Sequence, residues 1–293
     1  MDKVIIEARV NELAPRKENP NVPFLPHEIA ADAKACFEAG ASIVHFHGRA
    51  EDGSPDNSTE HYLSTIRQIR QACPILIHPS LGYVANDADA PTRFAAVETA
   101  MASPETQVDF APMDCGSVNV DWWDPVAKRY STENLIYKNS TETLLYFAER
   151  IKHFELIPYL VSWNVSFTRQ IDAFLQMGAL REPAYVCFCL TDGIMLSGHP
   201  GTEAGLDAHL AFLPKEKSFV WTVVNYKGDL FALTDKILRA GGHISIGTGD
   251  FPYTDMGEPT NADIIARVVE QARALGREPA SVDETRQMLR PAG

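Results

Sequence analysis

Short apolar runs alternate with longer amphipathic stretches along the whole chain. The short runs are rich in β-branched and aromatic residues and predict strands, whereas the longer stretches repeat their apolar residues at helical spacing. The predicted strands cover residues 4–10, 42–47, 74–79, 108–113, 156–163, 184–190, 218–224 and 243–248. The predicted helices cover residues 26–40, 59–72, 91–102, 141–154, 167–177, 203–212, 230–240, 261–275 and 282–289.

This regular alternation favours one (β/α)8 TIM barrel that spans residues 1–293. Neither a linker nor a change of composition divides the chain, and its 293 residues are enough for such a barrel, which needs about 250. The alternative is an open doubly wound sheet. It is less favoured because no GxGxxG follows the first predicted strand, so the usual dinucleotide-binding sequence is missing.

Two histidines share one face of the second predicted strand. His45 and His47 are two residues apart, so their side chains point the same way, while Val44 and Phe46 point to the other face. Two imidazoles on one rigid strand suit a divalent metal of the zinc type. The alternative is a pair of histidines hydrogen-bonded in a polar interior. The pair predicts a metal site that needs further ligands from elsewhere in the chain.

The carboxyl ends of the predicted strands are polar or glycine-rich, although the strands themselves are apolar. In a TIM barrel the active site is built at these ends. Glu7, Arg9 and Asn11 share one face of the first strand, where Glu7 and Arg9 could equally form a structural ion pair. Asp250 lies just beyond the eighth strand, at a mouth that already holds the two histidines, and a carboxylate there suits general-base catalysis.

Other polar residues at these ends are candidates for substrate binding. Ser80 and Gly82 follow the third strand, where a hydroxyl and free backbone amides could hold a carboxylate. Asn11 and Ser117 also lie at predicted strand ends and complete the candidate substrate-binding residues, although the pattern favours a loop cap for Ser117, as for Asn164 and Asp192.

Composition excludes several classes of protein. The net charge of -13 and the lack of a Lys/Arg cluster argue against a nucleic-acid partner. No apolar run is long enough to cross a membrane, and no signal-peptide pattern precedes the first strand. The 5 cysteines are scattered without a CxxC pattern, which indicates a reducing, cytoplasmic location, and Cys115 is interpreted as structural. Trp122 and Trp123 suggest loop packing or a subunit contact.

With these residues in view, the chain resembles the β-keto acid cleavage enzyme family, which includes the 3-keto-5-aminohexanoate cleavage enzymes. The resemblance covers essentially the whole chain. Each marker is weak alone, and it is their ordered set that is specific. The markers are Asn19-Pro20-Asn21-Val22-Pro23, Ala39-Gly40-Ala41, His45-Phe46-His47-Gly48-Arg49, Asp52-Gly53, Ser80-Leu81-Gly82, Cys115-Gly116-Ser117, Ser197-Gly198 and Gly241-Gly242-His243-Ile244.

The resemblance implies a TIM barrel that binds zinc and catalyses a Claisen-type exchange. In that reaction a β-keto acid and the co-substrate acetyl-CoA give acetoacetate and a new acyl-CoA. By resemblance, His45 and His47 hold the zinc, which polarises the keto oxygen, and Asp250 removes the α-proton. Ser80 and the backbone at Gly82 bind the substrate carboxylate. Members of the family tend to form homo-oligomers.

The chain departs from the family pattern on the eighth strand. The family has an arginine, a glycine two residues later, and Glu-Asp two further on, whereas this chain has Ser245, Gly247 and Gly249-Asp250. The expected glutamate ligand and arginine are therefore missing. Glu7 is the predicted replacement ligand, because the first strand of a closed barrel neighbours the eighth and the second; Asp250 is the second candidate.

Further departures bear on the arginine and on the substrate. The missing arginine leaves Lys227 or Arg9 to tune Asp250. Acidic residues that the family often places after Pro158 are Tyr159 and Val161 here, which leaves the identity of the keto acid open.

Two other functions remain as alternatives. Zinc hydrolases of the amidohydrolase kind also use a His-x-His pair, with further histidines at strand ends; His199 and His243 are available, but His243 begins the eighth strand, far from the mouth. A barrel without catalysis that binds a metabolite is the third possibility, since the glutamate and the arginine are missing.

Overall fold

Eight parallel strands form the centre of the molecule. The structure, a computed structural model, describes residues 2–81 and 88–290. The strands lie in the order β4-β3-β2-β13-β12-β11-β10-β5, and every neighbouring pair is parallel. Their bounds are β2 Ile6–Arg9, β3 Ile43–Phe46, β4 Leu76–Pro79, β5 Phe110–Asp114, β10 Ile157–Ser162, β11 Ala184–Thr191, β12 Phe219–Tyr226 and β13 His243–Ile246.

The sheet closes on itself between β4 and β5. The Asp109 N–H, one residue before β5, donates to the Ile77 carbonyl at 3.0 Å, and the Ile77 N–H donates to the Asp109 carboxylate at 2.9 Å. Arg70 and Arg286 both form ion pairs with the same carboxylate, at 2.6 and 3.1 Å. The seam is therefore joined by a side chain as well as by the backbone, and the predicted (β/α)8 barrel is confirmed.

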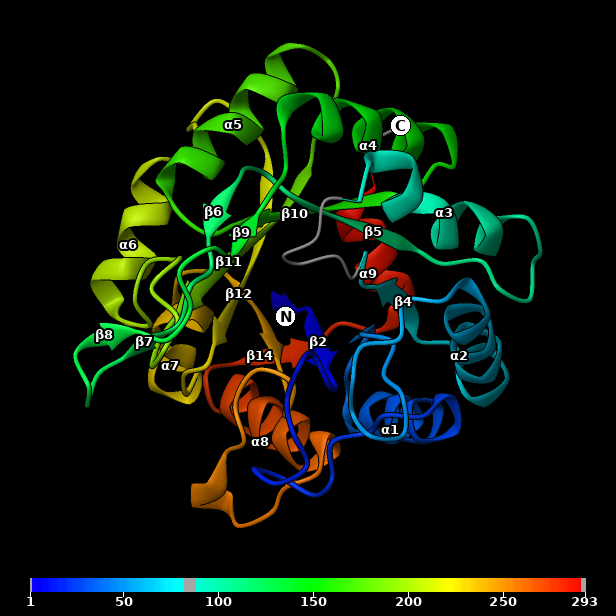
Figure 1. Cartoon of the computed structure of the whole chain (residues 1–293), viewed down its shortest axis with the longest axis vertical. Helices are drawn as coiled ribbons and strands as arrows, with labels where there is room; N and C mark the ends of the chain where they lie inside the picture. The colour runs from blue at the N-terminus through cyan, green and yellow to red at the C-terminus, as the bar shows by residue number, and fades with distance from the viewer. Residues whose placement is uncertain (1, 82–87, 291–293) are drawn as a thin grey trace.

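Eight helices surround the barrel in chain order (Figure 1). Ser58, Ser140 and Thr260 cap three of them, because each side-chain oxygen accepts a backbone N–H from the first turn. The helices are α1 Pro26–Ala39, α2 Thr59–Ala72, α3 Ala90–Met101, α4 Thr141–His153, α5 Val165–Gln176, α6 Glu203–Ala211, α7 Phe231–Arg239 and α8 Asn261–Ala274. The turn η1 (Thr254–Met256) lies between β13 and α8.

The interior of the barrel changes from apolar to polar along the strands. Ile5, Ile43, Leu76 and Phe110 are buried near the amino ends of the strands, in one apolar cluster with Val282 and Leu289 of α9 (Val282–Leu289). Two residues further along the same strands, the inward positions hold Glu7, His45 and His78. The apolar layer separates this polar layer from the amino end of the barrel, so the buried polar groups lie toward the carboxyl end, where TIM barrels build their active sites.

The first strand departs from its prediction. Residues 4–10 were expected to form one strand, but Asp2–Val4 (β1) pairs with β14 (Arg277–Pro279), and only Ile6–Arg9 joins the barrel. The segment between β5 and α4, expected as a long loop, contains two small antiparallel pairs: β6 Val118–Asn119 with β9 Ile136–Tyr137, and β7 Trp123–Asp124 with β8 Arg129–Tyr130. Among the described residues, no helix has the length and apolar character needed to cross a bilayer.

Candidate metal centre and active-site cavity

His45 and His47 both direct an imidazole nitrogen at one carboxylate, that of Glu12. The distances are 3.1 Å from His45 Nε2 to Oε1 and 2.5 Å from His47 Nε2 to Oε2. His45 Nδ1 lies 2.9 Å from the His78 carbonyl oxygen, which can only accept, so Nδ1 carries the proton and Nε2 has a free lone pair. Burial lowers the pKa of His45 to about 3, although Glu12 acts in the opposite direction. The imidazole is therefore neutral, the form that binds metals.

Glu12 is held in place by an unusual backbone and by an arginine. It follows β2 with φ of 33°, a left-handed value that is rare for a residue with a side chain. Arg49 Nη1 donates to the carbonyls of Glu12 at 2.7 Å and Asn11 at 3.2 Å, and Nη2 donates to that of Ala14 at 3.2 Å. Burial opposes the charge of Glu12, but Arg9, His47 and His45 outweigh it and hold the pKa of the carboxyl well below its usual range.

Gly249 makes room for the Glu12 side chain. A Cβ at position 249 would lie 2.8 Å from Glu12 Cγ and 2.8 Å from Glu12 N, which is closer than real Cβ atoms approach other heavy atoms. Position 249 is where the family resemblance leads us to expect the glutamate ligand. The Glu12 side chain thus lies against the position from which that glutamate would extend.

Glu7, the predicted third ligand, lies in the polar layer with His45 and His78. In the strand register Glu7 is opposite Ile43, and Arg9 is opposite His45. The Glu7 carboxylate accepts hydrogen bonds from His78 Nδ1 at 2.7 Å and from the hydroxyls of Tyr159 and Ser245. Burial opposes its ionisation, but His78 and Arg9 lower the pKa of Glu7 to about 2.

Two groups of side chains in the described parts of the chain could hold a metal. One contains Glu12, His45 and His47, and the other contains Glu7, His45 and His78. The first group unites both histidines of the His-x-His pair with a carboxylate. Its donor set, two imidazole nitrogens and a carboxylate oxygen, is that of catalytic zinc sites. The residues therefore fit such an ion.

Arg9 pairs with Asp250, for which the family resemblance leads us to expect an arginine on the eighth strand. Its Nε donates to both carboxylate oxygens of Asp250, at 3.0 and 3.1 Å, and its Nη2 forms an ion pair with Glu12. Burial works against the charge of Arg9, but the two carboxylates raise the pKa of the guanidinium above its usual value. Burial raises the pKa of Asp250 to about 8, assisted by Glu12 and opposed by Arg9. Among the groups that interact with Asp250, Arg9 is thus the cation that pairs with it.

A cavity of about 280 Å³ opens beside these groups at the carboxyl end of the barrel. Arg9, Glu12, His45, His47 and Ser80 line it, whereas Asp250 is not among its described lining residues. Leu13 and Trp122, which also line the cavity, are 42% and 46% exposed, so the cavity reaches solvent beside them. The rest of the lining is predominantly apolar: Leu81, Pro112, Val120, Leu135, Val161, Cys187, Cys189, Met195 and Val224, with the aromatic residues Tyr137, Tyr159, Trp163 and Tyr226.

The other predicted substrate-binding residues lie in different places. Asn11 donates to the His47 and Pro23 carbonyls and accepts from the His47 N–H at 2.8 Å, so it positions the backbone of the second histidine. Ser117 is exposed, and its hydroxyl accepts from the Asn139 N–H at 2.8 Å. Gly82 lies outside the described residues.

The two spare histidines of the hydrolase alternative make structural hydrogen bonds. His199 Nε2 accepts from the Val165 N–H at 3.3 Å, and His243 Nδ1 accepts from the Ile5 N–H at 3.0 Å. Within the described residues, neither belongs to a group that could hold a metal. The geometry therefore does not favour the hydrolase alternative.

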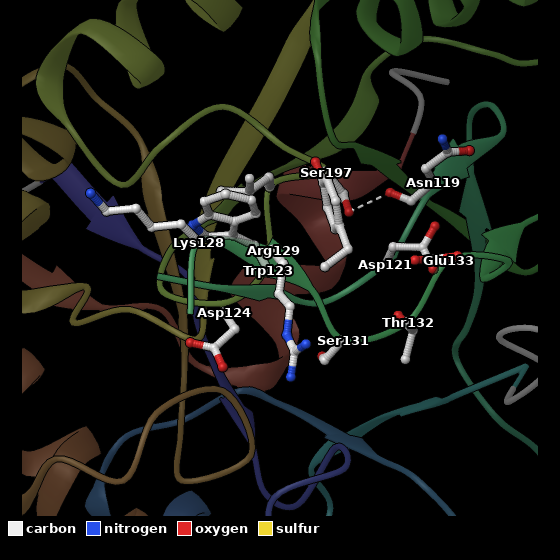
Figure 2. A pocket seen from close by; sticks show the side chains of 12 residues that line it. Asn119, Asp121, Trp123, Asp124, Lys128, Arg129, Ser131, Thr132, Glu133 and Ser197 are labelled. Atoms are coloured by element: carbon white, nitrogen blue, oxygen red, sulfur yellow. Dashed lines mark hydrogen bonds between the residues drawn. The ribbon is translucent and has the colours of Figure 1, made fainter. Parts of the chain in front are cut away.

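A second hollow, of about 890 Å³, lies on the segment between β5 and α4 (Figure 2). Alternate residues of one stretch line different hollows, with Val120 and Trp122 facing the apolar cavity and Asp121 and Trp123 facing this one. Its charged lining residues are Asp121, Asp124, Lys128, Arg129 and Glu133. Three carboxylates against two cations give no excess of positive charge for an anionic ligand.

Sequence reasoning missed Glu12 and Arg49 as parts of the site. Arg49 entered the sequence analysis only as part of the marker that contains the His-x-His pair, and Glu12 did not enter it. The available signal was an acidic residue placed just beyond the strand that neighbours the histidine strand.

Comparison with known proteins supports the resemblance inferred from the motifs. A sequence model of the beta-keto acid cleavage enzyme family matches residues 3–290. The 3-keto-5-aminohexanoate cleavage enzyme of Fusobacterium nucleatum subsp. nucleatum is 28% identical over 99% of this chain and 98% of its own. The 3-oxoadipate:acetyl-CoA acetyltransferase of Cupriavidus necator is 25% identical over 97% and 94%.

Solved structures support the fold. The binary complex of ObcA with oxaloacetate superposes with a TM-score of 0.71 at 13% identity, covering 92% of this chain and 67% of that one. That likeness concerns the barrel alone, whereas the sequence model spans nearly every residue. The chain belongs to the beta-keto acid cleavage enzyme family.

Proposed function

We propose that this protein is a zinc-dependent β-keto acid cleavage enzyme that uses acetyl-CoA as its co-substrate. The observation that carries the proposal is the convergence of His45, His47 and Glu12 beside a cavity at the mouth of a barrel of this family. The bond between the keto carbon and the α-carbon breaks. The carboxymethyl fragment joins the acetyl group to give acetoacetate, and the remaining acyl group joins the CoA sulfur.

In this proposal His45, His47 and Glu12 hold the metal, and Glu7 is a supporting residue. The Glu12 carboxylate faces both imidazoles, with Oε1 3.1 Å from His45 Nε2 and Oε2 2.5 Å from His47 Nε2, so the three side chains converge on one place. Glu7 already accepts three hydrogen bonds and faces His78. When bound, the zinc supplies Lewis-acid polarisation of the substrate's keto group.

Asp250 is the proposed general base. The α-proton of the keto acid moves to a carboxylate oxygen of Asp250, whose raised pKa of about 8 lets it hold that proton near neutral pH. Arg9 fixes the carboxylate through its Nε and joins it to Glu12, so the base and the metal ligand share one guanidinium. Ser80, buried beside the cavity, is the proposed contact for the substrate carboxylate.

We also expect a cytoplasmic homo-oligomer. Exposed Trp122, Val126, Tyr130 and Ile136 lie on the segment between β5 and α4, and such apolar side chains are suited to contact between subunits.

Metal analysis of two matched variants tests the ligand set. Glu12→Gln and Glu7→Gln each replace one buried carboxylate by an amide of the same shape. Purified wild type should hold about one zinc per chain. We expect Glu12→Gln to lose the zinc together with acetyl-CoA-dependent acetoacetate formation, and Glu7→Gln to keep the zinc with lower stability. Full zinc occupancy in Glu12→Gln would contradict the ligand assignment. Zinc without turnover of any β-keto acid would contradict the proposed reaction.

A ligand exchange makes the test sharper. Gly249→Glu alone should destabilise the protein, because its Cβ would lie 2.8 Å from Glu12 Cγ. Combining it with Glu12→Gly removes that contact, and glycine accepts the positive φ at position 12 without strain. We expect the double variant to bind zinc again, while Glu12→Gly alone does not.

A further inference from the structure

The walls of the cavity are uncharged on the side of β10, β11 and β12. The inward residues that line this side of the cavity include Val161 on β10 and Trp163 directly after that strand, Cys187 and Cys189 on β11, and Val224 on β12. None of these side chains carries a charge at neutral pH, and burial raises the pKa of both thiols. A substrate that extends from His45, His47 and Glu12 into this side therefore meets no charged side chain among these residues.

The carboxylates and the guanidinium that line the cavity already have ion-pair or hydrogen-bond partners. Arg9 is bound by Asp250 and Glu12, and Glu12 is bound by the two histidines. Asp114 accepts from Trp163 Nε1 at 2.6 Å through one oxygen and from the Tyr137 hydroxyl at 2.8 Å through the other. Both oxygens of Asp114 are thus occupied by neutral donors, and burial raises the pKa of its carboxyl.

The residues after Pro158 agree with this picture. The family resemblance leads us to expect acidic side chains on this strand, but the chain has Tyr159 and Val161. Tyr159 directs its hydroxyl to the buried Glu7, so its hydroxyl is unavailable to the substrate and its ring forms part of the wall. Val161 has no polar atom in its side chain and is the simplest place on β10 at which to introduce a charge.

We propose that the β-keto acid cleaved by this protein carries an uncharged, apolar group beyond its keto carbon. The inference rests on the proposed function and narrows its substrate class. The two relatives described above are named for substrates with an amino group or a second carboxylate at that end. A charged group taken out of water needs a partner, and here the candidate partners are already engaged. The cavity of about 280 Å³ suits a small acyl chain, and its nearby exposed rim leaves the bulk of CoA outside.

Turnover of four 3-keto acids of similar length tests the proposal: 3-oxooctanoate, 3-oxoadipate, 5-amino-3-oxohexanoate and a trimethylammonium analogue. With zinc-loaded enzyme and acetyl-CoA, we expect kcat/KM for 3-oxooctanoate to exceed each of the charged acids by at least about 100-fold. Equal or higher kcat/KM for any charged acid would overturn the inference while leaving the proposed function standing. The trimethylammonium analogue matters because aromatic walls can bind such cations.

A binding measurement separates failure of this inference from failure of the proposed function. If none of the acids is converted, the proposed reaction is wrong, and calorimetric titration of the zinc-loaded protein with the same acids still tests the cavity. Tighter binding of 3-oxooctanoate supports an apolar pocket, whereas tighter or equal binding of a charged acid overturns it.

Two variants at one position provide the matched control. Val161→Asp should lower kcat/KM for 3-oxooctanoate at least about 10-fold and raise it for 5-amino-3-oxohexanoate, since the new carboxylate can pair with the ammonium group. Val161→Asn has nearly the same shape without the charge, so it should not gain the amino substrate. Zinc content checks that both variants keep an intact site. A higher kcat/KM for 5-amino-3-oxohexanoate in both variants, or in neither, would contradict the role of Val161.

Discussion

Acid should destabilise this protein through His243, a histidine that lies far from the candidate site. His243 begins β13 and is 4% exposed, and its Nδ1 accepts the Ile5 N–H at 3.0 Å. Burial lowers the pKa of His243 to about 3, with the charge of Arg277 acting in the same direction. A protonated Nδ1 would point a hydrogen at the Ile5 N–H, so the folded protein keeps this imidazole neutral.

The size of the effect follows from the two pKa values. The unfolded chain takes up a proton as the pH falls below 6.5, whereas the folded protein resists until about 3, so stability is lost across this interval. One pKa unit corresponds to about 1.4 kcal/mol. Between about pH 7.5 and about pH 5, protonation of the unfolded state at this one residue should therefore lower the free energy of unfolding by about 2 kcal/mol.

The variant His243→Asn isolates this contribution. The Asn Oδ1 stands where Nδ1 does and can accept the same N–H, but it does not titrate. Urea unfolding of both proteins at the two pH values gives the free energies. The wild type should lose about 2 kcal/mol more than the variant on acidification, and the other buried histidines cancel in this comparison. Equal losses in the two proteins would refute the reasoning and show that His243 is not held neutral by its surroundings.

Two further predictions concern the proposed metal ligands Glu12, His45 and His47. Arg49→Lys removes the guanidinium that donates to the carbonyls of Asn11, Glu12 and Ala14. Zinc affinity, measured by chelator competition, should therefore fall about 10- to 100-fold. The control Arg16→Lys, near the same loop, should leave the zinc affinity nearly unchanged. An unaltered affinity in Arg49→Lys would mean that the loop holds Glu12 without it. Removing zinc with a chelator should lower the Tm of the wild type, and adding zinc back should raise the Tm progressively with zinc concentration, as expected for a ligand that binds only the folded protein. A Tm that does not depend on zinc would contradict a bound ion.

The barrel and the pair of histidines could be predicted from the sequence because both depend on local pattern. Alternating apolar runs and amphipathic stretches repeat often enough to identify eight βα units, and the two-residue spacing of His45 and His47 places them on one face. The small strand pairs between β5 and α4 were not predicted, since their strands are only two residues long and carry too little periodicity.

The partner of the two histidines could not be predicted because it depends on register and on a loop. Glu7 stays a prediction as a ligand: its backbone is level with Ile43, but its carboxylate forms a second possible ligand group with His45 and His78. The contact of Glu12 with the two histidines depends on the positive φ of Glu12, on the hydrogen bonds from Arg49 to the backbone, and on the absence of a Cβ at Gly249. Likewise, only the folded barrel shows that Arg9, rather than Lys227, pairs with Asp250.

The proposed replacement of a glutamate at position 249 by Glu12 bears on how members of such a family are judged to be active or inactive. A closed barrel arranges its strand ends in a ring. A carboxylate lost from the end of one strand can therefore be replaced by a carboxylate at the end of the neighbouring strand, at nearly the same place in space. A sequence alignment compares single columns and records this event as the loss of an essential residue. Under the proposed ligand set, a survey that requires glutamate at the position of Gly249 would wrongly discard this chain as inactive. A rule that accepts a carboxylate from the end of either neighbouring strand would retain this chain.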